Sequence, residues 1–209
     1  MSQRKGSLGG SDIWVSRLTK DGVWGDPKNL GGVINTTGSE EAVFIHPDNQ
    51  TLYFASDGHV GMGGLDIFVS KRGTDGEWGP PENLGYPINT FNDENGLIVG
   101  ASGDMAFFSS NREGGQGGLD LYSFKLHEKV RPVKVTYVKG NVYDSMSKEP
   151  LGSRFELLDL ATGQVVVESF SNKGNGEFLV CLPVNKDYAL NVSRKGYVFF
   201  SENFSKSLL

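Results

Sequence analysis

The stretch Gly63-Gly64-Leu65-Asp66-Ile67-Phe68 decides the fold, because it occurs three times at a fixed interval. Its copies are Gly9-Gly10-Ser11-Asp12-Ile13-Trp14 and Gly117-Gly118-Leu119-Asp120-Leu121-Tyr122, and the three aspartates are 54 residues apart. Shorter segments repeat with the same period: residues 21–25 return at 75–79, residues 29–31 at 83–85, and residues 34–36 at 88–90. No insertion interrupts the register, so residues 1–128 are predicted to form a structural repeat.

Each period predicts four short strands. In the second period, Ala42–Ile45 and Leu52–Ala55 are apolar runs joined by a Pro-Asp-Asn turn. A glycine-rich loop leads to a third strand at Asp66–Val69, and a Thr-Asp-Gly turn leads to an outer strand around Trp78. Apolar runs without strict alternation indicate strands that are covered on both faces. Four strands in a period of this length are typical of a propeller blade.

The repeats make an incomplete set of blades. Residues 11–30 supply two strands, residues 41–84 supply a complete blade, and residues 94–126 supply three strands, which amounts to about two and a half four-stranded blades. A closed propeller needs at least four blades. We therefore expect a partial β-propeller that starts inside a blade of a longer array, with a strand edge and an apolar flank left open.

These repeats resemble a known family. Residues 45–56 read Ile-His-Pro-Asp-Asn-Gln-Thr-Leu-Tyr-Phe-Ala-Ser, and with the Gly-Gly-Leu-Asp-Ile-Phe element that follows they resemble the TolB-type, WD-like propeller repeat of bacterial envelope proteins. The resemblance covers residues 2–126. The third repeat departs from it at the turn, where Ala101-Ser102-Gly103-Asp104 replaces the Pro-Asp pair.

The composition changes after Leu126, where residues 127–132 read as a short linker. Residues 1–128 contain 23 of the 29 glycines and carry a net charge of −8, whereas residues 129–209 contain 6 glycines and carry a net charge of +3. Short strands continue through residues 133–206, which predicts a small antiparallel β-sandwich. The predicted fold is therefore all-β, with domains at residues 1–128 and 129–209.

The second domain resembles a family as well. Residues 139–144 (Lys-Gly-Asn-Val-Tyr-Asp), 174–178 (Gly-Asn-Gly-Glu-Phe) and 196–197 (Gly-Tyr) follow one another as in the carboxypeptidase regulatory-like domain, a transthyretin-like sandwich that is not catalytic. The order of the two domains resembles periplasmic OmpA-family proteins of Bacteroidetes-type bacteria, some of which belong to secretion machinery. The resemblance implies a periplasmic or outer-membrane-associated protein with protein partners in the cell envelope. Such proteins commonly continue into a peptidoglycan-binding domain, which this sequence does not contain.

Several classes of function are not expected. Neither domain carries a run of basic residues, so nucleic acid is not an expected partner. No stretch of 18 apolar residues predicts a membrane-spanning helix, and the first residues lack the apolar segment of a signal peptide. Cys181 is the single cysteine, which excludes a disulfide within the chain.

No catalytic set emerges from the sequence. No HExxH pair provides zinc ligands, and Cys181 in its apolar strand is interpreted as a small buried side chain. Asp12, Asp66 and Asp120 follow glycine-rich loops, where each is expected to accept hydrogen bonds from backbone N–H groups of the loop. A calcium site at these aspartates is the alternative. We predict no enzymatic activity, no cofactor and no metal.

Four loop residues are the candidates for a specific contact: Asp57, His59, Asn111 and Arg112. The repeats differ most in this loop, which favours a role beyond the common framework. The main hypothesis is a non-enzymatic protein–protein interaction or scaffold module of the cell envelope. The alternative is a carbohydrate-binding propeller module. A third interpretation is an accessory propeller of a peptidase, for which the chain offers no Ser-His-Asp set.

Overall fold

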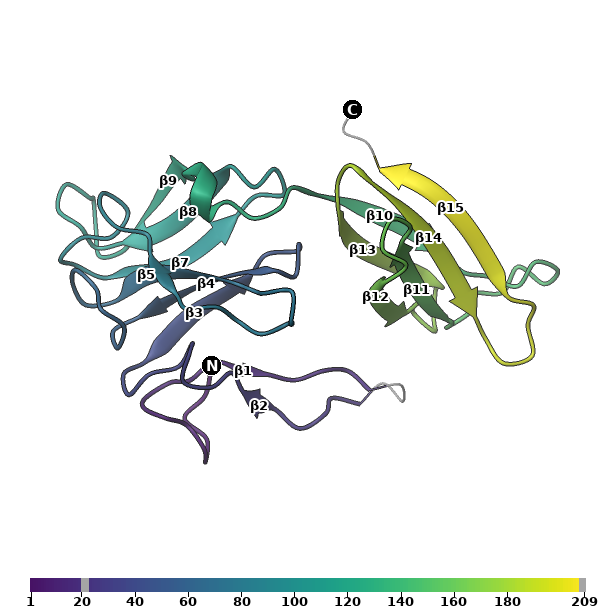
Figure 1. Ribbon diagram of the computed structural model, residues 1–209, viewed down its shortest axis with the longest axis horizontal. Coiled ribbons are helices and arrows are strands. Elements are labelled where there is room, and N and C mark those ends of the chain that lie inside the picture. Colours follow the sequence, from purple (N-terminus) through teal and green to yellow (C-terminus); the bar gives the residue numbers. More distant parts are fainter. Residues whose placement is uncertain (20–22, 207–209) are drawn as a thin grey trace. The chain divides into compact units, whose positions relative to one another are not determined.

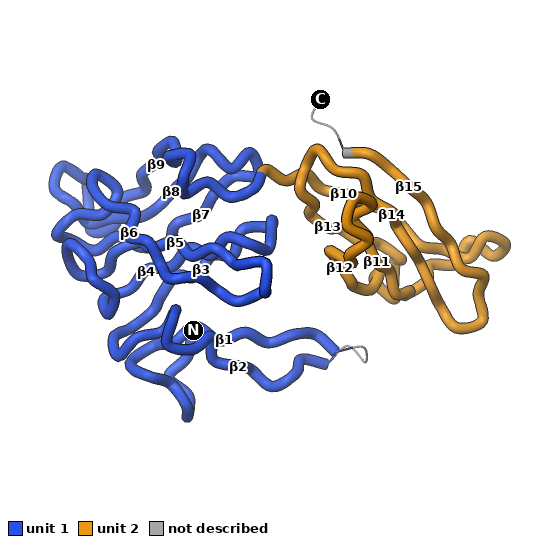
Figure 2. The backbone as a smooth tube through the Cα atoms, in the orientation of Figure 1, with its two compact units in different colours: residues 1–133 blue, residues 134–209 orange. Residues whose placement is uncertain are grey.

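The computed structural model describes residues 1–19 and 23–206 of the 209-residue chain (Figure 1). These residues form fifteen strands and one short 3-10 turn, η1 (Glu128–Val130), with no α-helix among them. The fold is therefore all-β, as expected. In the described part of the chain, no helix is long and apolar enough to cross a membrane. The chain divides into two compact units, residues 1–133 and residues 134–209 (Figure 2).

Unit 1 consists of three antiparallel sheets, one for each repeat, and none of them is closed. The first repeat forms β1 (Trp14–Val15) and β2 (Lys28–Asn29). The second forms β3 (Glu40–Ile45), β4 (Thr51–Ser56), β5 (Asp66–Lys71) and β6 (Glu82–Asn83), and the third forms β7 (Glu94–Val99), β8 (Met105–Ser110) and β9 (Asp120–Lys125). Within each sheet the strands are neighbours in chain order. Two, four and three strands are the numbers that the sequence predicts.

One strand lies elsewhere than predicted. Trp78 forms only an isolated bridge with Arg72, and the fourth strand of the second sheet is β6, which pairs with β5. In this hairpin Gly73 N donates to Glu77 O at 2.8 Å and Gly79 N donates to Lys71 O at 2.9 Å. The Arg72 guanidinium lies 4.4 Å from the centroid of the Trp78 ring. The corresponding Asp-Gly turn at residues 21–22 lies outside the described residues.

The core of unit 1 lies on both faces of the second sheet. All six residues of β4 are buried. Leu52 and Phe54 pack with Ile13 and Ile34 of the first repeat, whereas Tyr53 packs with side chains of the third repeat. Burial on both faces explains why this strand reads as an apolar run in the sequence.

The first two strands of the second sheet and the first two strands of the third sheet each contain a bulge, at the same repeat position. The register shifts between Glu41 and Phe44 in the second sheet and between Asn95 and Ile98 in the third. The residue at the bulge has a positive φ, which is +43° for Ala42 and +68° for Gly96.

Two asparagine side chains form hydrogen bonds with a strand residue in the way that a neighbouring strand would. Asn89 accepts a hydrogen bond from Ile67 N (2.8 Å) and donates to Ile67 O (2.9 Å). Asn35 makes the same pair of bonds with Ile13, at 2.8 and 3.0 Å. Both asparagines are buried, so each amide satisfies a backbone N–H and C=O that water does not reach.

The end of unit 1 is fastened to its second sheet. Tyr53 Oη donates to Val130 O (2.6 Å), and Val133 N donates to Asp48 Oδ2 (2.8 Å). Burial raises the pKa of the Asp48 carboxyl, but the hydrogen bonds that it accepts, Val133 among them, outweigh burial and hold the pKa below its ordinary value. These contacts explain why the division between the units follows residue 133, a few residues beyond the boundary drawn from composition.

Unit 2 consists of two antiparallel sheets. β10 (Val135–Asn141) pairs with β13 (Glu177–Pro183). The other sheet has the order β12-β11-β14-β15 and contains β11 (Arg154–Asp159), β12 (Val165–Phe170), β14 (Lys186–Ser193) and β15 (Phe200–Lys206). Phe155 and Leu157 of the larger sheet share one apolar cluster with Phe178 and Leu182 of the smaller one. Phe155 and Phe178 have ring centroids 4.7 Å apart.

The bulge at Ala42 gives a first prediction. An alanine in the left-handed region is strained, whereas glycine occupies it without a steric penalty. We predict that Ala42→Gly raises the free energy of unfolding of unit 1 by about 0.5 kcal/mol, after allowance for the greater freedom of glycine in the unfolded chain. Gly96→Ala, the reciprocal change, lowers it by about 1 kcal/mol. Urea denaturation checks both, and changes of the same sign at the two positions would contradict the assignment.

The asparagine pairs give a second prediction. In Asn89→Asp the carboxylate faces Ile67 O and Asn83 Oδ1 without a donor, so unit 1 loses about 2–4 kcal/mol of unfolding free energy at neutral pH. The loss shrinks as acid protonates the carboxyl and restores a donor. Asn111→Asp is the matched control, because Asn111 is exposed and Asp57 holds the same place in the second repeat. Equal losses in the two variants by urea denaturation would contradict the prediction.

Candidate functional site

The four candidate residues lie in two equivalent loops. Asp57 and His59 lie between β4 and β5, and Asn111 and Arg112 lie between β8 and β9. Asp57 Oδ1 accepts a hydrogen bond from Ser39 N (2.6 Å), and Asn111 Oδ1 accepts one from the equivalent Asp93 N (3.0 Å). In the second and third sheets, the same loop position therefore accepts a hydrogen bond from the residue just before the first strand.

His59 occupies a site between its loop and the segment before β3. Its Nε2 lies 2.8 Å from Ile34 O. Its ring centroid lies 5.8 Å from that of Phe54 and 5.2 Å from that of Phe68. The side chain is half-buried, and its one polar contact and two aromatic contacts hold a glycine-rich loop in place.

Arg112 occupies the corresponding site in the third repeat. Its two terminal nitrogens donate to Pro87 O (2.8 Å) and Ile88 O (2.5 Å). Its guanidinium carbon lies 4.9 Å from the centroid of the Phe108 ring and 5.0 Å from that of Tyr122. Ile88, Phe108 and Tyr122 are the repeat equivalents of the three residues that His59 contacts. An arginine and a histidine thus fill one site in two repeats.

In the first repeat an arginine also occupies this site. Arg4, two periods before Arg112, lies with its guanidinium carbon 5.3 Å from the centroid of the Trp14 ring. Arg4 Nε donates to Ser2 Oγ at 3.1 Å, and Arg112 Nε donates to Ser110 Oγ at the same distance. The differences between the loops therefore reflect alternative ways of fastening them, in addition to any contact with a partner.

A buried glutamate that the sequence did not reveal lies beneath the His59 site and another beneath the Arg112 site. Glu94 accepts hydrogen bonds from Thr90 N and Thr90 Oγ1, both at 2.7 Å, and from Ser110 Oγ at 2.8 Å. Arg112 adds an ion pair with it at 3.3 Å. Glu40 is buried in the equivalent set with Thr36 and Ser56. The signal was present, because these threonines, glutamates and serines also recur after 54 residues.

The three repeated aspartates bind backbone groups of their glycine-rich loops. Leu8 N donates to Asp12 (2.8 Å) and Gln116 N donates to Asp120 (2.8 Å). Asp66 accepts from Met62 N in the same way. This confirms the structural interpretation of these aspartates. Within residues 1–19 and 23–206, no group of three or more histidine, cysteine, aspartate or glutamate side chains is placed to hold a metal ion.

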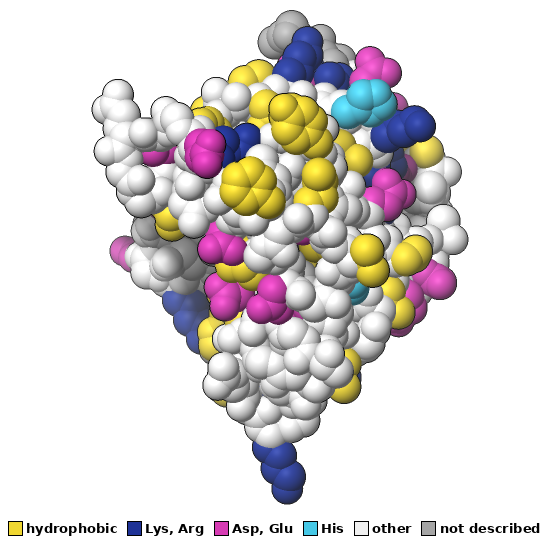
Figure 3. Space-filling view, turned by 90° about the vertical axis from the view of Figure 1, so that its left-hand side faces the viewer, with side chains coloured by type: hydrophobic (Ala, Val, Ile, Leu, Met, Phe, Trp, Pro, Cys, Tyr) yellow, Lys and Arg dark blue, Asp and Glu magenta, His cyan; other side chains and the backbone are white. Residues whose placement is uncertain are grey.

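The third sheet has one uncovered apolar face. Leu97 and Phe108 are buried on its inner side. Its other side presents exposed side chains from all three strands, which we call the open blade face: Ile98, Met105, Phe107 and Leu121. In the second repeat, the same positions are occupied by Phe44, Thr51, Tyr53 and Ile67, of which Phe44, Tyr53 and Ile67 pack against the third sheet. On the face drawn in Figure 3, apolar side chains lie between acidic and basic ones.

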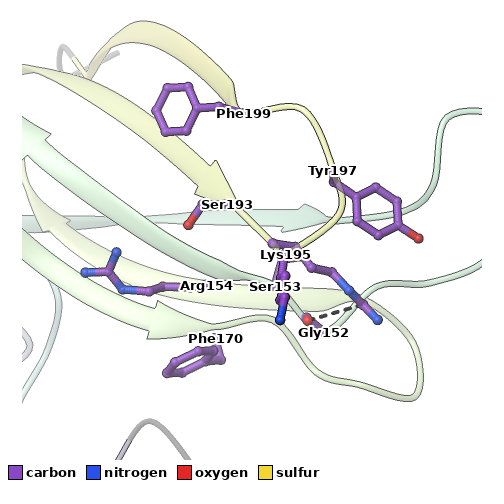
Figure 4. Close-up of a pocket in the computed structure, with 9 residues that line it drawn as sticks. Gly152, Ser153, Arg154, Phe170, Ser193, Lys195, Tyr197 and Phe199 are labelled. Carbon is purple, nitrogen blue, oxygen red and sulfur yellow. Dashed lines mark hydrogen bonds between the residues drawn. The ribbon is translucent and has the colours of Figure 1, made fainter.

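A shallow pocket of about 400 Å³ lies in unit 2 (Figure 4). Phe170, Tyr197 and Phe199 contribute aromatic rings to its lining, and Arg154, Arg194 and Lys195 contribute cations. Arg194 donates to Gly152 O at 3.3 Å, the dashed bond in Figure 4. Arg154 is paired with Glu156 and, at 2.8 Å, with Glu168. The lining itself contains no carboxylate, so this pocket does not provide the two carboxyl groups that glycoside cleavage requires.

The shared loop site gives a third prediction. Arg112→Gly removes two hydrogen bonds to backbone carbonyls and the cation beside Glu94, so it lowers the unfolding free energy of unit 1 by about 2–4 kcal/mol. Adding Glu113→His rebuilds the Gly58-His59 arrangement of the second repeat and recovers at least half of that loss. Glu113→His alone, at an exposed position, is the control and has little effect. A double variant no more stable than Arg112→Gly in urea would show that the two sites are not equivalent.

No family model matches the chain, and neither the curated proteins nor the solved structures include a match to it. The three repeats therefore serve as comparisons for one another.

Proposed function

We propose that this chain is a non-enzymatic scaffold module of the bacterial cell envelope, which assembles through the open blade face with a second copy of itself. The observation that carries the proposal is a contrast between equivalent side chains. Leu121 is 76% exposed on the third sheet, whereas Ile67, its counterpart on the second sheet, is 1% exposed. The same face is a packed interface in one repeat and an open surface in the next.

A second copy is the occupant because it carries the same open apolar face, and side chains at these repeat positions pack against a sheet in the second repeat. In the second repeat, Tyr53 and Ile67 lie against the third sheet. Two apolar sheet faces pack about 10 Å apart with their side chains interdigitated. A single face can serve both partners in a symmetric dimer, the commonest form of assembly. Fully burying one leucine-sized side chain contributes about 1.5–3 kcal/mol.

Location and architecture belong to the same proposal. The order of the two domains, with its resemblance to OmpA-family proteins, supports the periplasm or the outer membrane as the site of action. The three successive antiparallel sheets of unit 1 support a propeller-type array of blades, and the shared core of unit 2 supports a transthyretin-like sandwich. Rigid sheets that display surfaces to partner proteins suit a scaffold.

Self-association of the full chain tests the proposal. Sedimentation velocity over a range of concentrations is expected to show a reversible dimer. Leu121→Asp places a charge on the open blade face and raises the dissociation constant at least about tenfold, the equivalent of 1.4 kcal/mol. Val60→Asp is the matched control, because Val60 is exposed in the β4–β5 loop away from this face, and it leaves the dimer unchanged. A wild-type chain that stays monomeric, or equal effects of the two variants, would refute the proposal.

A further inference from the structure

The pocket in unit 2 lies where strands of the larger sheet begin or end. Arg154 at the start of β11 lies opposite Phe170, the last residue of β12, and opposite Ser193, the last residue of β14. Residues opposite one another on antiparallel strands share a face of the sheet. Phe155, the next residue of β11, is buried in the core, so Arg154 and its two neighbours lie on the outer face. The loop at residues 194–199 supplies further lining (Figure 4).

Three cations line the pocket, and one of them is already paired. Arg154 forms ion pairs with Glu156 and Glu168. In the described part of the chain, neither Arg194 nor Lys195 forms an ion pair, and both side chains are exposed. Two positive charges of the lining are therefore available to an anion from solution.

Arg194 is held in place and keeps its capacity to bind an anion. It donates to Gly152 O at 3.3 Å, and its guanidinium carbon lies 5.4 Å from the centroid of the Tyr197 ring. A guanidinium has five N–H donors, so most of them remain for a ligand. A carboxylate accepts two such donors in parallel, which is a strong and directional contact.

The rest of the lining combines apolar rings with one unsatisfied hydroxyl. Phe170 is 40% exposed and Phe199 is 59% exposed. Ser153 is 2% exposed, and its Oγ has no hydrogen-bond partner among the described residues. Buried hydroxyls are nearly always hydrogen-bonded in folded proteins, so an acceptor bound at this wall would complete the hydrogen bonding of Ser153. The lining thus offers positive charge, apolar surface and a hydroxyl donor together.

We propose that this pocket binds a carboxylate carried on an apolar body, as at the C-terminus of a peptide that ends in an apolar residue or in a free aromatic acid. The carboxylate pairs with Arg194 and Lys195, and the apolar body packs against Phe170 and Phe199. A volume of about 400 Å³ is at the lower end of the range for ligand sites, which suits a ligand of this size. The glutamates beside Arg154 disfavour a dianion such as a phosphate monoester, because like charges placed close together repel.

This site is independent of the open blade face. All residues of the pocket belong to unit 2, whereas the open blade face belongs to unit 1. Ligand binding at the pocket and self-association through the open blade face are measured separately. The failure of either proposal therefore leaves the other one standing.

N-Acetylphenylalanine is the probe, because it carries one carboxylate and one aromatic ring. In NMR spectra of the full chain, it shifts the amide signals of residues 152–154 and 193–199 with a dissociation constant of about 1 mM, as expected for a small ligand in an open site. N-Acetylphenylalanine amide lacks the charge and binds at least about fivefold more weakly. N-Acetylglycine lacks the ring and is weakened by a similar factor. A tripeptide that ends in phenylalanine separates the two sources of the carboxylate, because tighter binding than that of the single residue assigns the site to peptides and equal binding assigns it to free acids.

Single substitutions locate the binding. Arg194→Gln and Lys195→Gln each remove one cation and weaken binding of the acid about fivefold. Lys148→Gln is the matched control and leaves the dissociation constant unchanged, because Lys148 is an exposed lysine elsewhere in unit 2, with its Nζ 5.4 Å from the centroid of the Tyr143 ring. The proposal is overturned if the acid shifts no signal of residues 152–154 and 193–199, if the acid and its amide bind equally, or if both Arg194→Gln and Lys195→Gln bind the acid as the unmodified chain does.

Discussion

The interior of unit 1 depends on one interaction, which is the packing of both faces of the second sheet against the neighbouring repeats. β4 shows this packing most clearly, because all six of its residues are buried between two other sheets. Leu52 faces the first repeat and Tyr53 faces the third. A repeat unit of this size cannot bury both of its faces alone. The stability of the second sheet is therefore set as much by its neighbours as by its own strands.

Polar side chains join the sheets at their margins. Asn35 and Asn89 continue the hydrogen bonding of the strands through their amides. Glu40 and Glu94 gather the hydroxyl and N–H groups of the connecting segments. Each of these groups is buried, and each would be destabilising without its partners. The identical arrangement in successive repeats shows that these contacts belong to the framework, although they consist of residue types that are also common in binding sites.

Much of the fold was predictable from the sequence, because the 54-residue period carries it. The period located β3, β4 and β5 in the second repeat and β7, β8 and β9 in the third, and the glycines and aspartates located the loops between them. The strand expected at Trp78 was wrong, because an Asp-Gly turn and an aromatic residue do not show how far a hairpin extends. β6 begins beyond this hairpin, where two residues pair with β5.

The candidate site was less predictable, because variation between repeats has two physical origins. His59 and Arg112 differ in chemistry but make equivalent contacts with a backbone carbonyl and two aromatic rings. The sequence shows that the residues at these positions differ between the repeats. It does not show that the different residues make the same contact. The exposure of these side chains could not be predicted from the sequence either, because Ile67 and Leu121 are both apolar residues that follow the equivalent aspartate of their repeat. What separates them is the presence of a covering sheet, a property of the assembled repeats.

The difference between the second and third repeats also explains why the third sheet presents an apolar face. On the third sheet the strands are paired with one another and a whole face is open, so a partner must offer another face. This surface follows from the packing that holds the interior together. The second sheet, whose neighbour is present, buries Ile67, whereas the third sheet leaves the equivalent Leu121 exposed to a partner.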